Sequence, residues 1–163
     1  MNLKSHPNFP FFEKIMHMFY KTSQKSLDKN RGCLLEVLTR TMKPSIRVSS
    51  YKMIPESLVY YNSTKLSDKD LDVVLHYEQI ELFECKASLY NFLRNDPLPK
   101  KNKEKLALMS NINSLAASHS IVCYPYLVTY ALNDSLLKHK LSNAGFNSLI
   151  ILSRQEIMKR LSA

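Results

Sequence analysis

One stretch of this chain, residues 71–87 with the sequence LDVVLHYEQIELFECKA, limits the possible folds more than any other. Two apolar runs, VVL and IELF, flank the polar residues HYEQ, and this pattern predicts two adjacent strands joined by a short turn. Asp72 enters the first run and Glu84 ends the second. A hairpin of this length therefore brings the two carboxylates to neighbouring positions at one end of the strand pair.

Lys86 adds an ammonium group to these two carboxylates. It follows Glu84 by two positions, and side chains two apart in a strand share a face of the sheet. Carboxylate oxygens are the ligands that Mg²⁺ and Mn²⁺ prefer. A neighbouring lysine can orient or deprotonate water and offset charge on a phosphate. The segment thus predicts a metal-dependent site for phosphodiester hydrolysis.

The pattern D-x(11)-E-x-K within this hairpin resembles the PD-(D/E)XK nuclease superfamily, also called restriction-endonuclease-like. The segments RGCLLEVL, DLDVVL and ELFECKAS are similar to the nuclease domains of CRISPR ancillary effectors and restriction-like proteins. Leu71 stands where the family name has proline. The resemblance implies an endonuclease in which Asp72 and Glu84 hold one or two Mg²⁺ or Mn²⁺ ions. Lys86 would orient the water, and the backbone carbonyl of Cys85 would be a further metal ligand.

Four other residues are candidates for the metal site. The resemblance implies that Glu36, on the helix before the sheet, reaches the metal, whereas a surface charge or an ion pair is the alternative. Asp68 and Asp70 compete with Asp72, and Asp70 is the reserve because it shares the strand face of Asp72. His17 could be a ligand, as in the similar viral cap-snatching endonucleases, although an exposed helix histidine is favoured.

The remaining pattern predicts an α/β protein with a mixed sheet flanked by helices, in agreement with the αβββαβ core that the resemblance implies. We expect one domain over residues 1–163, with its core at about 30–155 and a helical extension at 1–29. Pro55 is expected in a turn, Pro125 at a strand end or edge, and Gly145 at a helix end. The expected helices span residues 11–20, 32–42, 104–118, 135–144 and 155–161; the expected strands outside the hairpin span 46–52, 57–61, 120–130 and 146–152.

Charge is unevenly distributed along the chain, whose formal net charge is +9. Residues 45–85 carry seven acidic and four basic side chains, and basic segments flank them in the sequence. This favours a polyanionic partner, with DNA preferred over RNA, although a merely solvated surface is the alternative. Lys100, Lys101 and Lys103, in an expected exposed loop over residues 94–103, could hold a phosphate backbone. A homodimer is left open.

Several other functions are excluded or kept as alternatives. The chain has no apolar run of membrane-spanning length and no signal-peptide pattern, so we expect a cytoplasmic protein without membrane contact. Its three cysteines lack CxxC spacing, which argues against zinc, and G-x-S-x-G and P-loop motifs are absent. The alternatives to an endodeoxyribonuclease are a non-catalytic nucleic-acid-binding or regulatory module, and an RNA endonuclease of the cap-snatching type.

Overall fold

The fold is a five-stranded mixed sheet between two layers of helices. The computed structural model describes residues 27–95, 97–131 and 135–161. The sheet has the strand order β1-β4-β5-β6-β7, and β2 and β3 form a separate hairpin. The helices are α2 (Leu27–Thr41), α3 (Leu89–Phe92), α4 (Lys100–Ser118), α5 (Ser135–Asn143) and α6 (Arg154–Leu161); the strands are β1 (Lys52–Ser57), β2 (Tyr60–Tyr61), β3 (Thr64–Lys65), β4 (Leu71–His76), β5 (Ile80–Cys85), β6 (Cys123–Val128) and β7 (Ile150–Leu152).

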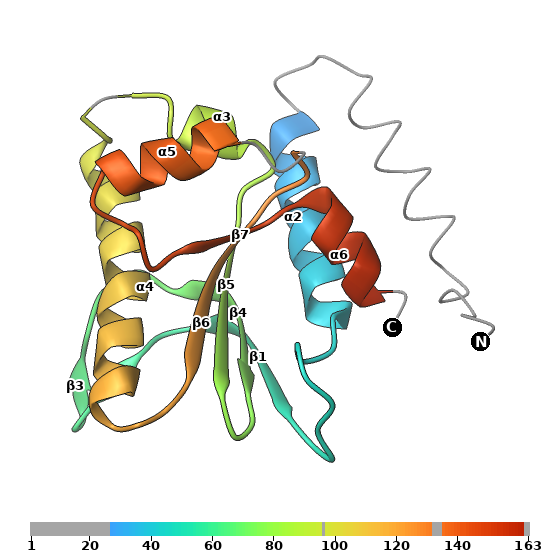
Figure 1. The fold of residues 1–163 in the computed structure, drawn as a ribbon, viewed down its shortest axis with the longest axis vertical. Coiled ribbons are helices and arrows are strands. Elements are labelled where there is room, and N and C mark those ends of the chain that lie inside the picture. Colours follow the sequence, from blue (N-terminus) through green and yellow to red (C-terminus); the bar gives the residue numbers. More distant parts are fainter. Residues whose placement is uncertain (1–26, 96, 132–134, 162–163) are drawn as a thin grey trace.

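The helices cover both faces of the sheet. In Figure 1, α4 and α5 lie on one side of the strands, and α2 and α6 lie on the other. Strands β1, β4 and β5 run antiparallel, whereas β5, β6 and β7 run parallel and are joined through α4 and α5. The mixed α/β class expected from the sequence is therefore confirmed.

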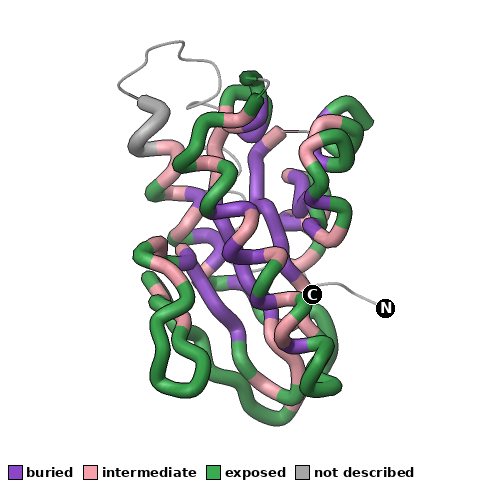
Figure 2. The backbone as a smooth tube through the Cα atoms, turned by 90° about the vertical axis from the view of Figure 1, so that its left-hand side faces the viewer, coloured by how far each residue is buried: buried purple, intermediate pink, exposed green. Residues whose placement is uncertain are grey.

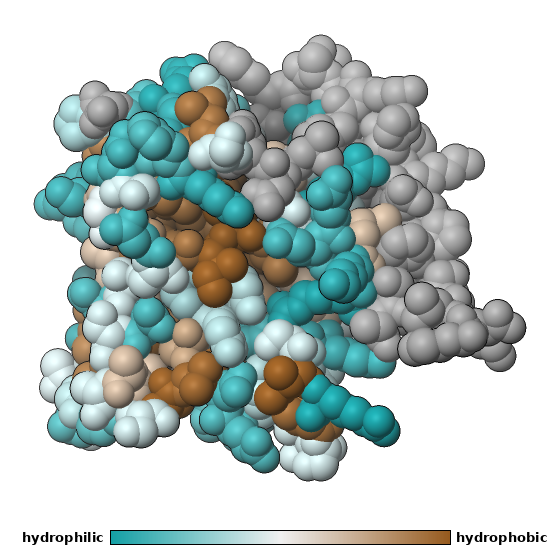
Figure 3. Space-filling model, in the orientation of Figure 1, coloured by the Kyte–Doolittle hydropathy of each residue, from teal (hydrophilic) through white to brown (hydrophobic). Residues whose placement is uncertain are grey.

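Each face of the sheet has its own hydrophobic core, and alternation along β4 and β5 divides the side chains between them. Leu82 faces α4 and α5, whereas Phe83 faces α2 and α6. Figure 2 shows the buried residues concentrated along the central strands, with exposed loops at the lower end. In Figure 3, hydrophobic residues reach the surface in front of β7 and below α5, and hydrophilic ones surround them.

A buried ion pair joins β5 to the C-terminal helix. Glu81 is completely buried, and one of its oxygens accepts hydrogen bonds from the Ser45 amide and the Tyr77 hydroxyl, both at 2.6 Å. Its other oxygen accepts from the Arg160 guanidinium, which also lies over the rings of Phe83 and Tyr126. Burial and the bond to Glu81 raise the pKa of Tyr77 to about 12. Because Glu81 is cut off from water and the Arg160 side chain is only 14% exposed, each charge depends on the other.

The first strand of the sheet differs from the prediction. Residues 46–51 are not in a strand, although their alternating pattern favoured one, and Ile46 and Tyr51 are exposed. The strand spans residues 52–57 and includes Pro55, which was expected in a turn. Pro55 pairs with Val73 at the edge of the sheet, where its missing N–H costs little.

The loop and strand predictions on either side of the hairpin need smaller corrections. The strand expected at 57–61 is divided: Ser57 ends β1, and only residues 60–61 form a further strand, β2. Asn62 and Ser63, both at positive φ, make the tight turn from β2 into β3. The expected loop at 94–103 is shorter, because α4 begins at Lys100, directly after Pro99. The short helix α3 was not predicted.

The C-terminal elements follow the prediction with two differences. Pro125 lies inside β6, a central strand, but β7 pairs with β6 only from Tyr126 onward, so Pro125 has a strand neighbour on one side. Strand β7 covers residues 150–152 rather than 146–152, because the chain first closes α5. Gly145, at φ +83°, and the bond from the Phe146 amide to the Leu141 carbonyl end that helix.

Some predictions fall on residues outside the described part of the chain. They are the helix at 11–20, the candidate ligand His17 and residues 1–26 of the expected extension. Helix α2 itself begins at Leu27, five residues earlier than predicted. None of the helices in the described ranges has the length and apolar character required to cross a bilayer.

Candidate functional site

A small polar cleft lies at the end of β4 and β5 where the predicted site residues meet. Its volume is about 330 Å³, and its walls come from the segment before β4, the end of β5, helix α3 and the first turns of α4. The lining residues are Lys69, Asp70, Asp72, Glu84, Lys86, Phe92, Lys101, Asn102 and Lys105. The cleft therefore contains Asp72, Glu84 and Lys86 together.

The strand register brings Asp72 and Glu84 together. Val73 pairs with Phe83 in the antiparallel ladder, so the next position along each strand sets Asp72 opposite Glu84. Asp72 Oδ2 accepts a hydrogen bond of 2.6 Å from the Cys85 amide, which ties this carboxylate to β5. The prediction that the hairpin makes these carboxylates neighbours is confirmed.

Glu84 lies between two ammonium groups. Its side chain is almost completely buried, with Lys86 Nζ 2.6 Å from Oε1 and Lys105 Nζ 2.9 Å from Oε2. The Lys86 amide donates a hydrogen bond to the Val128 carbonyl at 2.8 Å, which fixes the backbone of this lysine against β6. Its ammonium also lies 5.4 Å from the centre of the Phe92 ring.

Lys105 is a site residue that the sequence prediction missed. It projects from α4, and only 9% of its surface is exposed. Besides Glu84, its ammonium contacts the backbone carbonyl of Asp70 and lies 3.5 Å from the Asp70 carboxylate. A signal was available, because Lys105 precedes Met109 and Ile112 at the spacing of one helix face, where a lysine needs a buried partner.

Burial and charge act on the pKa of the central pair. Burial raises the pKa of Glu84, and the nearby Asp72 carboxylate raises it further, against the opposing effects of the two lysines. For Lys86, burial alone would lower the pKa, but the Glu84 carboxylate and the bond to it outweigh burial and raise it. Lys86 is therefore a cation near neutral pH.

Asp68 and Asp70, the two alternatives to Asp72, differ in their position relative to the cleft. Asp70 lines the cleft and holds Lys105 through its carbonyl and its carboxylate. Asp68 lies outside the cleft, where its side chain is 94% exposed and pairs with Lys65 at 2.8 Å. That exposed pair lowers the pKa of Asp68. Asp70 and Asp72 both line the cleft, and the preference for Asp72 as a metal ligand stays a prediction.

Glu36 lies beside the cleft but is not part of its lining. It is half-buried on α2 and pairs with Arg40 at 3.9 Å. Burial raises the pKa of Glu36, and so does the charge of Asp72, whereas Arg40 and Lys86 lower it. Glu36 is thus within electrostatic reach of Asp72 and Lys86, while the ion pair weighed as its alternative role is also present.

The three lysines predicted to bind nucleic acid have separate environments. All three belong to the first turns of α4 rather than to a loop. Lys101 lines the cleft, and Lys103 lines a second cavity on the other side of the α3–α4 connection. Lys100 lines neither cavity and lies 3.9 Å from Glu104 with its side chain in solvent.

The thiol of Cys85 is on the opposite side of β5 from Glu84 and Lys86, as the strand alternation predicted. Its sulfur lies 3.3 Å from the Thr39 hydroxyl within the core below α2. Burial raises the pKa of this thiol well above its ordinary value. Cys85 is therefore not placed to act as a nucleophile in the cleft.

The three cysteines should differ sharply in reactivity. Cys33 is exposed, Cys85 is buried, and burial raises the pKa of Cys123 to about 11. We expect iodoacetamide near neutral pH to modify Cys33 in the native protein, and the other two only after unfolding. Peptide mass spectrometry measures this directly. Modification of native Cys85 at the rate of Cys33 would contradict the burial of that strand.

The oxygen atoms of the cleft suit a hard divalent cation. The described residues contain no group of three or more His, Cys, Asp or Glu side chains arranged to hold a metal. The cleft does contain two facing carboxylates, and Glu84 Oε2 accepts no hydrogen bond although it is buried beside Lys105. Mg²⁺ is usually held by only one or two carboxylates, with water and substrate phosphate completing its shell. The donor set of Asp72 and Glu84 therefore fits.

Comparison with protein-family models, curated proteins and solved structures finds no match for this chain.

Proposed function

We propose that this protein is a metal-dependent nuclease that hydrolyses phosphodiester bonds in the cleft of Asp72, Glu84 and Lys86. The observation that carries the proposal is the gathering of these three side chains with Lys105 in one small cleft. Burying this many charges together is unfavourable for folding alone, because each needs a partner. It suits a reaction in which a polyanion is bound and cleaved.

In this proposal Asp72 and Glu84 hold Mg²⁺ or Mn²⁺, with the Cys85 carbonyl as a further oxygen ligand. When bound, the metal supplies Lewis-acid activation of water and of the phosphate. The Cys85 amide keeps Asp72 in place by donating a hydrogen bond to Oδ2, and this carboxylate would help to hold the metal. Lys86 donates hydrogen bonds to the attacking water and to the phosphate oxygens, because it is positively charged and fixed beside Glu84.

Lys105 is proposed as a positioning residue that supplies a second positive charge from the protein itself. Its ammonium contacts Glu84 Oε2, the Asp70 carbonyl and the Asp70 carboxylate. Without Lys105, these oxygens would suit a second metal ion. We therefore propose one divalent ion for each chain.

Replacement of Lys105 by methionine should separate metal binding from catalysis. Removing the ammonium leaves Glu84 Oε2 without its neighbouring positive charge, so we expect Mn²⁺ to bind about tenfold more tightly, since that charge no longer competes with the metal. Cleavage should fall at least about tenfold, because the charge near the reacting phosphate is lost. Calorimetric titration and cleavage rates measure the two effects. Lys69→Met, which removes a cleft lysine paired with Glu104 at 3.5 Å, is the control; weaker metal binding in Lys105→Met alone would contradict the positioning role.

The chain order of the elements also supports the proposal. Helix α2, strands β1, β4 and β5, helix α4 and strand β6 follow the α-β-β-β-α-β order that the sequence resemblance implied. The carboxylates of Asp72 and Glu84 lie on the second and third strands of this series. We therefore propose the restriction-endonuclease-like fold, with the β2–β3 hairpin, α3, α5, β7 and α6 as additions.

The proposal is tested by incubating the protein with plasmid, linear duplex DNA, single-stranded DNA and RNA, each with Mg²⁺, Mn²⁺ or EDTA. We expect cleavage of at least one polymer only when metal is present. Cleavage of RNA alone would favour the RNA endonuclease alternative. Binding that depends steeply on salt, but without cleavage under any of these conditions, would favour the non-catalytic nucleic-acid-binding module.

A further inference from the structure

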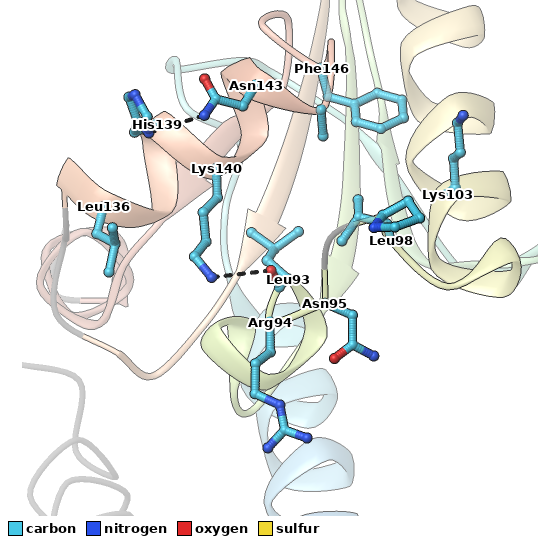
Figure 4. Close-up of a pocket in the computed structure, with 12 residues that line it drawn as sticks. Leu93, Arg94, Asn95, Leu98, Lys103, Leu136, His139, Lys140, Asn143 and Phe146 are labelled. Atoms are coloured by element: carbon cyan, nitrogen blue, oxygen red, sulfur yellow. Dashed lines mark hydrogen bonds between the residues drawn. The ribbon is translucent and has the colours of Figure 1, made fainter.

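A second cavity, which lies beside the cleft, has a lining suited to a nucleotide. Its volume is about 470 Å³, within the range of roughly 300–1,000 Å³ typical of small-molecule sites. It lies between α5, the connection from α3 to α4, and the start of α4, and it opens to solvent (Figure 4). The cleft of Asp72 and Glu84 does not use these residues.

Among the residues that the structure describes, every charged residue that lines this cavity is basic. Arg94, Lys103 and Lys140 line it together with His139, and none of the aspartates and glutamates that the structure describes does. In Figure 4 the Lys140 side chain runs from α5 toward the Leu93 carbonyl, 3.4 Å from its nitrogen. The same ammonium lies 5.0 Å from the centre of the Tyr90 ring, so it is held at a defined position. This lining favours an anion such as a phosphate.

The cavity also offers an apolar surface, which a free phosphate would not need. Leu93, Leu98, Leu136 and Phe146 contribute to its lining, and Figure 4 shows Leu98 and Phe146 in the space between α5 and α4. Leu136 is 46% exposed. Apolar side chains beside cations match the two parts of a nucleotide, a base with apolar faces and a charged phosphate.

The cavity and the cleft share a wall. Phe92 and Asn102 line the cleft, and their direct neighbours in the chain, Leu93 and Lys103, line the cavity. The Asn102 side-chain amide donates to the Phe92 carbonyl at 2.8 Å, which joins the two segments of this wall. A strand whose phosphate lies in the cleft can thus continue over the start of α4 and present a neighbouring nucleotide to the cavity.

We infer that this cavity binds one nucleotide of an unpaired strand next to the scissile phosphate. The inference rests on the proposed function and assigns its substrate class, since a base that enters a cavity cannot remain paired in a duplex. Lys103, on α4, and Lys140, on α5, contact phosphates of the strand from two sides of the cavity, and the base contacts Leu136. The preferred substrate is therefore single-stranded, or unpaired at the cleavage point.

The inference is tested by the binding of a fluorescent single-stranded oligonucleotide in EDTA, measured by anisotropy over a range of salt concentrations. The double variant Lys103→Gln/Lys140→Gln should bind at least about tenfold more weakly, with a salt slope smaller by about 1. Leu136→Gln should weaken binding about fivefold without changing the slope, because it removes an apolar contact. The matched control is Lys52→Gln/Lys138→Gln, two exposed lysines outside both cavities, and it should bind like the wild type.

Two results would overturn the inference. One is an equal loss of affinity in the control double variant. The other is an equal effect of the cavity variants on a duplex of the same sequence. Failure of the proposed function is read separately, from wild-type hydrolysis of a small chromogenic phosphodiester with Mn²⁺. The predicted binding losses without any hydrolysis would leave the cavity as a nucleotide site on a binding module.

Discussion

Replacement of Asp72 by asparagine will lower metal-dependent cleavage by at least about 100-fold, an effect typical of removing a group that stabilises transition-state charge. The variant keeps the size of the side chain and an oxygen that can accept the Cys85 amide. It loses the negative charge that the proposal assigns to the metal. We therefore expect the thermal unfolding temperature to stay near that of the wild type while the single-turnover rate falls.

Asp68→Asn is the matched control for this prediction. Asp68 lies four residues earlier in the same approach to β4, but its carboxylate is exposed and pairs with Lys65. The control should cleave at the wild-type rate. Equal rates for wild type, Asp72→Asn and Asp68→Asn would indicate that the observed cleavage does not depend on this cleft.

Replacement of the buried Glu81 by glutamine will lower the free energy of unfolding more than any other single substitution proposed for this protein. Glu81 is completely buried and is the ionic partner of Arg160, whose side chain is only 14% exposed. Breaking a buried ion pair by removing one partner costs about 3–5 kcal/mol, which corresponds to a fall of roughly 10 °C in unfolding temperature for a domain of this size. Differential scanning calorimetry measures the fall.

Two variants define what the Glu81 result means. Glu78→Gln removes an exposed carboxylate from the adjacent turn and should leave the unfolding temperature unchanged. The double variant Glu81→Leu/Arg160→Met should recover much of the loss, because no unpaired charge is then left in the core. An unfolding temperature of Glu81→Gln equal to that of Glu78→Gln would contradict the role assigned to this pair.

The strongest part of the sequence prediction was the hairpin, because strand alternation and turn length together fix which residues face each other. Asp72 and Glu84 are opposed in the ladder, and Cys85 turns away from Lys86, as expected. Local patterns of this kind need no knowledge of distant segments.

The parts that the sequence did not predict depend on contacts between distant segments. Lys105 reaches Glu84 from a helix that covers the sheet, and only the packing of α4 on β5 makes that contact possible. The segment around Ser45 alternates like a strand, but the Ser45 amide donates a hydrogen bond to the buried Glu81, and the chain forms no strand before β1 begins at Lys52. In both cases a buried carboxylate of β5 decides the local structure.

The most direct test of the central claim is the rate of phosphodiester cleavage by metal-stripped wild-type protein, measured before and after addition of Mn²⁺. We predict no cleavage before addition, cleavage after it, and a return to zero when EDTA is added in excess. Cleavage that continues at the same rate in EDTA would contradict a metal site at Asp72 and Glu84. No cleavage of any tested polymer with Mn²⁺ or Mg²⁺ would contradict the nuclease function itself.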